Sequence, residues 1–264
     1  MKKLLNCVKY DFKEGIVKNK YFYLIEIFLL AIFSIDTIFY MDNNPGVLEI
    51  SLNVFAGMEE YNPQLGMAFK IPMEYLSFSL LSGIFVCYYP KKEWQLRGSQ
   101  FICRYGNTDT WWFSKVLWNI LQSIIIYIAA FVVIYISAVI GGNGGFSVRY
   151  DTPYLGMLLN NNSMTVFLYC YILGAATIIA INQMIVTLQM IFSPVAGYIS
   201  AIIIVIISAY YFNEYLPGNN LMMLRTELFR EDGIVLYKGL VVAFVIWLVF
   251  VILGKIALKK KDIL

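Results

Sequence analysis

The sequence predicts an all-α integral membrane protein with six transmembrane helices and both termini in the cytoplasm. Hydrophobic residues make up 60% of the 264 residues and charged residues only 14%, whereas soluble domains have about 45–50% apolar and about 25% charged residues. The apolar runs are continuous over about 20 residues, as in membrane helices, and do not alternate over about 10 residues as barrel strands do. Basic residues cluster beside alternate apolar runs, which sets the orientation.

Residues 1–20 are predicted to form an amphipathic helix that lies on the membrane surface. At about 100° per residue, apolar residues fall on one stripe, lysines flank it, and Asp11 and Glu14 face away. The apolar stripe consists of Leu5, Val8, Phe12 and Ile16. The alternative interpretation is a basic N-terminal tail that only fixes the topology.

Six apolar runs follow and account for one transmembrane domain that covers residues 1–264. The predicted spans are residues 21–40, 73–89, 111–140, 164–188, 194–212 and 234–253. Fifteen of the 20 Lys and Arg residues lie in the N-terminal segment, in the connection between the second and third spans, or near the C-terminus. These segments are therefore expected in the cytoplasm. The third run is long enough to tilt or to include an interfacial turn.

The chain carries no motif for nucleotide binding or catalysis. A phosphate-binding loop needs a Gly five residues before a Gly-Lys-Ser/Thr sequence, but Gly254-Lys255 is preceded at that distance by Val249 and followed by Ile256. The absence of His removes His-based zinc hydrolysis, Ser-His catalysis and His proton relays. The four cysteines imply no disulfide framework. We therefore expect no enzyme activity, no catalytic or metal site and no cofactor in this chain.

The connection between the second and third spans mixes basic and aromatic residues. Pro90 suits a first helical position, Gly98 interrupts, and Ser99 can cap a short helix that ends at Tyr105. Aromatic residues and Arg dominate protein interfaces, so this coupling helix is expected to dock another protein. The expected docking residues are Trp94, Arg97, Phe101, Ile102, Arg104 and Tyr105. The alternative is anchoring in lipid headgroups, which we expect for Trp111, Trp112 and Lys115.

Polar residues inside the apolar runs are the candidates for a substrate cavity. Glu26 lies in the first span, where it would face a water-filled cavity, be neutral, or pair with a lysine of the N-terminal segment. Asn182 and Gln183 form a second polar position in the fourth span, and interhelical hydrogen bonding is expected for at least one of them. Gly197 and Ala201 are spaced four apart in the fifth span, which permits close helix approach and suggests a seam between two subunits.

The layout resembles the permease subunits of type-2 ABC exporters. These have a basic amphipathic N-terminal helix, six spans, a coupling helix between the second and third spans, and a small outer element before the last span. Here the outer element would be residues 213–233, with an amphipathic stretch at 221–229. The run RYGNTDTWWFSKVLWN at 104–119 is similar to the corresponding segment of small permeases in export of, or immunity to, antimicrobial peptides such as lantibiotics.

The resemblance implies a half-transporter in the cytoplasmic membrane of a bacterium. Two permeases, identical or homologous, would form the pathway for a peptide or an amphiphile. Two copies of a separate ATPase would bind ATP and Mg²⁺ and dock on the coupling helices, and no nucleic acid is expected among the partners. Glu26, Asn182 and Gln183 would fit a cavity wall. Two other classes remain open: an autonomous secondary carrier or channel, and an intramembrane lipid-modifying enzyme.

Overall fold

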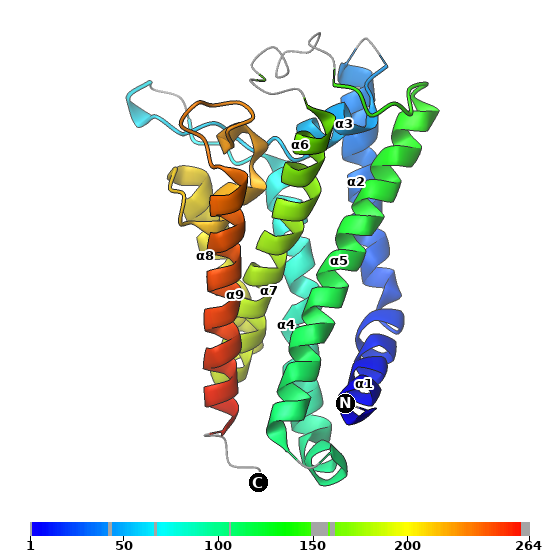
Figure 1. Ribbon diagram of the computed structural model, residues 1–264, viewed down its shortest axis with the longest axis vertical. Helices are drawn as coiled ribbons and strands as arrows, with labels where there is room; N and C mark the ends of the chain where they lie inside the picture. The colour runs from blue at the N-terminus through cyan, green and yellow to red at the C-terminus, as the bar shows by residue number, and fades with distance from the viewer. Residues whose placement is uncertain are drawn as a thin grey trace.

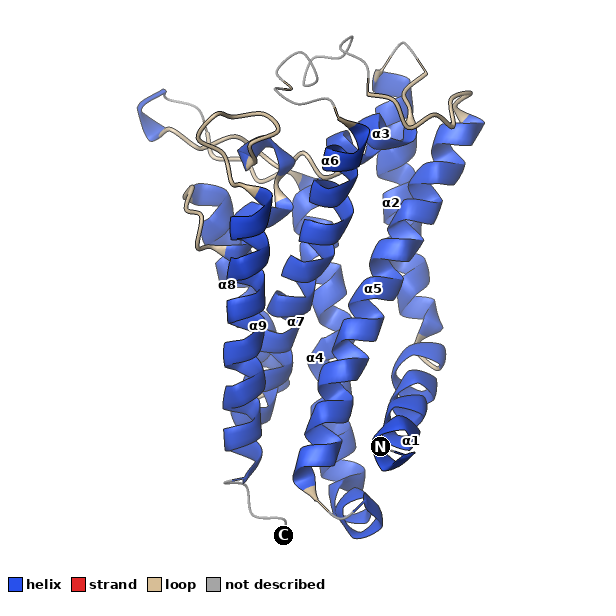
Figure 2. Ribbon diagram, viewed as in Figure 1, coloured by secondary structure: helices blue, strands red, loops and turns tan. Residues whose placement is uncertain are grey.

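A computed structural model describes residues 2–41, 44–65, 68–105, 107–148, 158 and 162–259, and for residues 2, 65, 99 and 101–105 it describes the backbone only. Within these residues the regular secondary structure is helical and forms one elongated bundle (Figures 1 and 2). The principal helices are α1 (Lys2–Asp11), α2 (Lys20–Tyr40), α3 (Val47–Val54), α4 (Met73–Tyr105), α5 (Thr108–Ile140), α6 (Ser163–Phe167), α7 (Gly174–Ile191), α8 (Pro194–Tyr210) and α9 (Leu236–Lys259). Short π-helices, η1 (Phe12–Val17) and η4 (Leu168–Leu173), follow α1 and α6.

Four helical segments of the described chain are long and apolar enough to cross a membrane, which makes this a multi-pass membrane protein. They are Lys20–Tyr40, Thr108–Ile140, Ser163–Ile191 and Leu236–Lys259. They confirm the first, third, fourth and last predicted spans as helices. The second and fifth predicted spans are also helical, in α4 and in the 17-residue α8, but their crossing of the membrane stays a prediction.

The connected ends of α4 and α5 form the hairpin end of the bundle, which we define as residues 90–119. Each helix contains 33 residues, so each is about 50 Å long at 1.5 Å per residue. The hairpin end extends beyond the ends of α7 and α8, and α1 and the last turn of α9 lie at the same end (Figure 1). α3, residues 141–148 and the connection before α9 gather at the opposite end (Figure 1).

The predicted short coupling helix is not a separate element, because α4 is continuous through Pro90 and Gly98. A proline inside a helix has no N–H for the carbonyl four residues earlier, here that of Val86. The side chain of Gln189 in α7 replaces this donor, with its Nε2 2.7 Å from the Val86 carbonyl oxygen. The segment 94–105 is therefore the last part of α4.

Replacing Gln189 with leucine should lower the free energy of unfolding by about 1–2 kcal/mol, because the buried Val86 carbonyl would lose its donor. In the Pro90→Ala background the same replacement should cost less, since the introduced alanine would supply the missing N–H. Unfolding midpoints of the wild type, both single variants and the double variant in mild detergent measure this coupling. An equal loss of unfolding free energy in both backgrounds would show that Gln189 does not replace the donor that Pro90 lacks.

The N-terminal segment is helical as predicted, but the side with Asp11 is not turned away from the protein as predicted, and Ile16 of the apolar stripe is buried. Asp11, which was expected to face away, is buried, as is Cys7 four residues earlier, whereas Leu5 and Phe12 are exposed. The π-helix η1 then continues to Val17. Gly15 in η1 lies directly against α5, because a Cβ there would be 2.5 Å from Trp118 Nε1. α1 and η1 are thus part of the bundle, and their apolar Leu5 and Phe12 are left for lipid.

The predicted subunit seam on α8 is instead a contact within the chain. Gly197 and Ala201 are both buried, and a Cβ on Gly197 would be 2.8 Å from the carbonyl oxygen of Ile185 in α7. Small residues let two helix backbones approach closely, as expected, but here both helices belong to the same chain. The exposed apolar face of α8 includes Val195, Ile199 and Ile203, and it is the part of this helix left for lipid or another chain.

The element before α9 is compact and largely buried. Residues 221–229, expected to be amphipathic, form short 3₁₀ turns and loops in which Met222, Met223 and Leu228 are inside the protein. Arg225 is fully buried among them, and its guanidinium donates to the carbonyl groups of Ser208 and Ala209 at the end of α8. This element closes the end of the bundle that lies opposite the hairpin end.

Candidate functional site

A buried ion cluster joins three helices at the hairpin end. Lys115 of α5 forms ion pairs with Asp11 of α1 and with Glu93 of α4, and all three side chains are at most 4% exposed. Tyr89 of α4 donates a hydrogen bond of 2.8 Å to Oδ1 of Asp11. One ammonium group therefore holds the N-terminal helix and both arms of the hairpin together.

Aromatic rings surround the Lys115 ammonium. Its Nζ lies 4.8 Å from the ring centroid of Tyr89 and 5.1 Å from that of Trp111, distances at which the ring faces attract a cation. The expected headgroup anchoring of Trp111, Trp112 and Lys115 is wrong, since all three are buried. Instead Trp111 packs on Trp94 and Trp112 donates to the Val251 carbonyl in α9. The basic and aromatic residues are here used for packing between helices.

Glu93 lies beyond the predicted span 73–89, and its burial raises the pKa of its carboxyl from 4.5 to about 7, against the opposing effect of Lys115. The folded state therefore holds the proton more tightly than the unfolded state. Stability from this group is fully present below pH 4.5 and is lost as the pH rises through about 7.

Raising the pH from 5.5 to 8 should lower the free energy of unfolding by about 2 kcal/mol through Glu93 alone. The Glu93→Gln variant should lose this pH dependence, because its side chain does not titrate. Glu60→Gln, which removes an exposed acid at the opposite end, is the matched control and should keep it. Unfolding midpoints measured across this pH range make the comparison. If stability fell with pH as steeply in Glu93→Gln as in the wild type, Glu93 would not be the group responsible.

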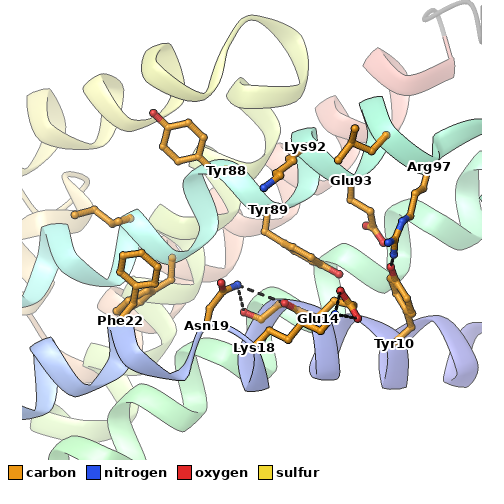
Figure 3. Close-up of a pocket in the computed structure, with 14 residues that line it drawn as sticks. Tyr10, Glu14, Lys18, Asn19, Phe22, Tyr88, Tyr89, Lys92, Glu93 and Arg97 are labelled. Atoms are coloured by element: carbon orange, nitrogen blue, oxygen red, sulfur yellow. Dashed lines mark hydrogen bonds and ion pairs between the residues drawn. The ribbon is translucent and has the colours of Figure 1, made fainter.

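A cavity of about 610 Å³ lies beside the ion cluster, between the N-terminal segment and α4. Tyr10, Glu14, Lys18 and Asn19 line it from the N-terminal side, and Tyr88, Tyr89, Lys92, Glu93 and Arg97 line it from α4, with Tyr89 pointing toward the N-terminal segment (Figure 3). Glu14 forms an ion pair of 2.7 Å with Lys18. Phe22, Ile84 and Phe85 line the part of the cavity nearer the predicted spans. The cavity therefore has a charged part and an apolar part.

The structure brings two of the predicted docking residues to this region. Trp94 packs its ring 4.8 Å from that of Trp111. Arg97 is exposed, and its guanidinium donates to the hydroxyl of Tyr10 and lies 5.8 Å from that ring centroid. The side chains of Phe101, Ile102, Arg104 and Tyr105 lie outside the described residues, although the α4 backbone is described through Tyr105. Docking on 94–105 stays a prediction.

Glu26 lies in α2 away from this cavity. Its side chain is buried, and neither carboxylate oxygen has a hydrogen-bond partner among the residues that the structure describes. The predicted pairing with an N-terminal lysine is not among the ion pairs of the described chain. Its role in a cavity wall stays a prediction.

Asn182 and Gln183 belong to a polar layer between α5 and α7. Nδ2 of Asn182 lies 3.3 Å from Ser123 Oγ, and Gln183 Oε1 accepts a bond of 3.2 Å from Asn119. The interhelical hydrogen bonding expected for this pair is therefore present. Gln122 is buried in the same layer, and neither its Nε2 nor its Oε1 has a partner among the described residues.

Sequence reasoning missed the ion cluster of Asp11, Glu93 and Lys115. A signal was present in the first helix: Cys7, Asp11 and Gly15 lie four residues apart on one face, which suits close contact with another helix. The partners of Asp11 are about 80 and 100 residues away, however, and no local pattern pairs them.

No family model, no curated protein and no solved structure matches this chain.

Proposed function

We propose that this chain is the membrane subunit of an ATP-driven transporter, powered by a separate ATPase that docks on residues 94–105. The observation that carries the proposal is the length of the hairpin end. Two helices of about 50 Å exceed the hydrocarbon core, about 30 Å thick, by several turns. The excess lies on the side where the basic segments of the chain gather, which favours the cytoplasm.

The ion cluster supports this proposal mechanically. A force on the end of α4 would pass to α5 and α1 through Lys115, because the two carboxylates that it pairs with are on different helices. Buried side chains pack too densely to slip past one another, so the three elements would move together. In this proposal the hairpin end is the lever between the ATPase and the spans.

The remaining parts of the assembly follow from the resemblance to type-2 ABC exporters. Two copies of the permease, or this chain and a homologous one, would form the pathway in a bacterial cytoplasmic membrane, with six spans each. Two ATPase copies would hold ATP and Mg²⁺. The cargo would be a peptide or an amphiphile, of the kind handled by antimicrobial-peptide export and immunity systems.

The experiment is ATP hydrolysis by candidate ABC ATPases from the same genome, measured in liposomes with and without the chain. The wild-type chain should change the rate of ATP hydrolysis severalfold. A hairpin-end variant that replaces Phe101, Ile102 and Arg104 with alanine should leave that rate unchanged. A matched control at the opposite end replaces the exposed Val139, Ile140 and Arg230 and should behave as the wild type. A hydrolysis rate that is the same with and without the wild-type chain would overturn the proposal.

One observation favours a second candidate, an autonomous carrier or channel. Glu26 is a buried acid without a hydrogen-bond partner among the described residues, and such groups inside membranes often serve ion pathways. This candidate predicts cation flux in liposomes that contain only this chain, detected with a potential-sensitive dye and abolished by Glu26→Gln. The transport-subunit proposal predicts no such flux.

A further inference from the structure

The cavity between the N-terminal segment and α4 has the size and composition of a ligand site. Its volume of about 610 Å³ is within the range of about 300–1,000 Å³ that is usual for small-molecule pockets. We infer that it binds an anionic phospholipid of the bilayer, with the phosphate at Lys92 and Arg97 and an acyl chain along Phe22, Ile84 and Phe85. This inference holds whether or not an ATPase drives the chain.

The charged part of the cavity has two cations that form no ion pair with the described residues. Lys92 forms no hydrogen bond there either, and the contacts of Arg97 within the described chain are to the neutral hydroxyl and ring of Tyr10. Glu14 is bound to Lys18, whereas Lys115 is shared by Glu93 and Asp11. The four cations beside the cavity thus exceed the three acids by one, and an anionic headgroup would meet two unpaired cations at a net positive site.

The apolar part is placed for an acyl chain. Ile84 and Lys92 are eight residues apart on α4, so about 12 Å of helix separates the apolar part from the first cation. The rings of Phe22 and Phe85 are 6.5 Å apart and meet edge to face. Figure 3 shows Phe22 and Arg97 at opposite ends of the cavity. A ligand that fits must be apolar at one end and anionic at the other.

The surroundings favour a lipid from the bilayer over a soluble ligand. Phe22 is 51% exposed, and Ile25, three residues further along the same side of α2, is exposed as well. This surface is part of a predicted span, so the apolar part of the cavity opens toward the hydrocarbon region. The charged part would lie at headgroup depth, where Lys and Arg bind anionic lipids.

The test measures lipid retention by the purified full chain, using native mass spectrometry with phosphatidylglycerol or phosphatidylcholine added. The wild type should retain phosphatidylglycerol at least fivefold better than phosphatidylcholine. Lys92→Gln should reduce this preference about fivefold, the usual effect of one cation near an anionic membrane. The matched control is Lys91→Gln, because Lys91 has the same charge but points to the Phe192 carbonyl and does not line the cavity.

Two further arms test the apolar part and the source of the anion. Ile84→Trp should fill the acyl position and reduce retention of phosphatidylglycerol severalfold, whereas Ile128→Trp, on the exposed face of α5, should not. Soluble glycerol 3-phosphate should fail to displace the bound lipid. Equal losses in Lys91→Gln and Lys92→Gln, equal retention of the two lipids, or displacement by glycerol 3-phosphate would each overturn the inference.

Discussion

Replacing Lys115 with methionine should lower the free energy of unfolding by about 3–5 kcal/mol, the usual loss when one partner of a buried ion pair is removed. The substitution keeps most of the apolar volume but leaves Asp11 and Glu93 without their common cation in a site that water does not reach. The two carboxylates would then repel each other or take up protons. Unfolding midpoints in mild detergent, by heat or denaturant, measure the loss.

Two comparisons separate this effect from a general loss of charge. Lys255→Met removes a half-exposed ion pair with Asp109 in the same region and should cost at most about 1 kcal/mol. The triple variant Asp11→Asn, Glu93→Gln and Lys115→Met should recover most of the stability, because no unpaired charge remains. A loss below about 1 kcal/mol in Lys115→Met would contradict the ion cluster as described.

Replacing Arg225 with methionine should lower the free energy of unfolding by about 3 kcal/mol or more, because several buried carbonyl groups would lose their donor at about 1–3 kcal/mol each. Its guanidinium donates to the carbonyls of Ser208, Ala209 and Tyr211, at the end of α8, and to those of Met58 and Glu59 in another connection. The last carbonyls of a helix have no partners within it and attract a cation through the helix dipole. Burial lowers the pKa of Arg225 to about 10, so the group stays charged at neutral pH.

The matched control is Arg230→Met, which removes an exposed pair with Glu60 in the same element. This variant should lose at most about 1 kcal/mol. Protease digestion should also cut residues 213–235 faster in Arg225→Met, because this side chain bonds the element both to the end of α8 and to residues 58–59. Equal stability of the two arginine variants would show that the buried guanidinium of Arg225 does not stabilise the element before α9.

Much of the helix content could be predicted because lipid imposes a strong constraint. A spanning helix needs about 20 apolar residues, and the runs that begin near Tyr21 and Trp111 are long enough to be found without tertiary information. Their predicted limits agree with α2 and α5 to within a few residues. The continuity of α4 could not be predicted, because Pro90 is compensated by Gln189, a donor that lies 103 positions from Val86.

The buried face of the N-terminal helix was mispredicted for a related reason. The segment was predicted to lie on the membrane surface, with its apolar stripe in lipid and Asp11 facing away. Leu5 and Phe12 are exposed as that prediction requires, whereas Asp11 is buried in an ion pair with Lys115. Sequence alone gives the apolar stripe, but it does not show that the side with Asp11 packs against α5, because Lys115 lies 104 positions away.

The most direct test of the proposed function is whether a candidate ABC ATPase from the same genome binds the chain through the hairpin end. The two proteins would be expressed together, purified through a tag on the chain, and separated by size in detergent. We expect the ATPase to co-elute with the wild type and with the variant altered at Val139, Ile140 and Arg230. It should be lost from the variant altered at Phe101, Ile102 and Arg104. An ATPase that elutes alone when the chain is wild type would contradict the account.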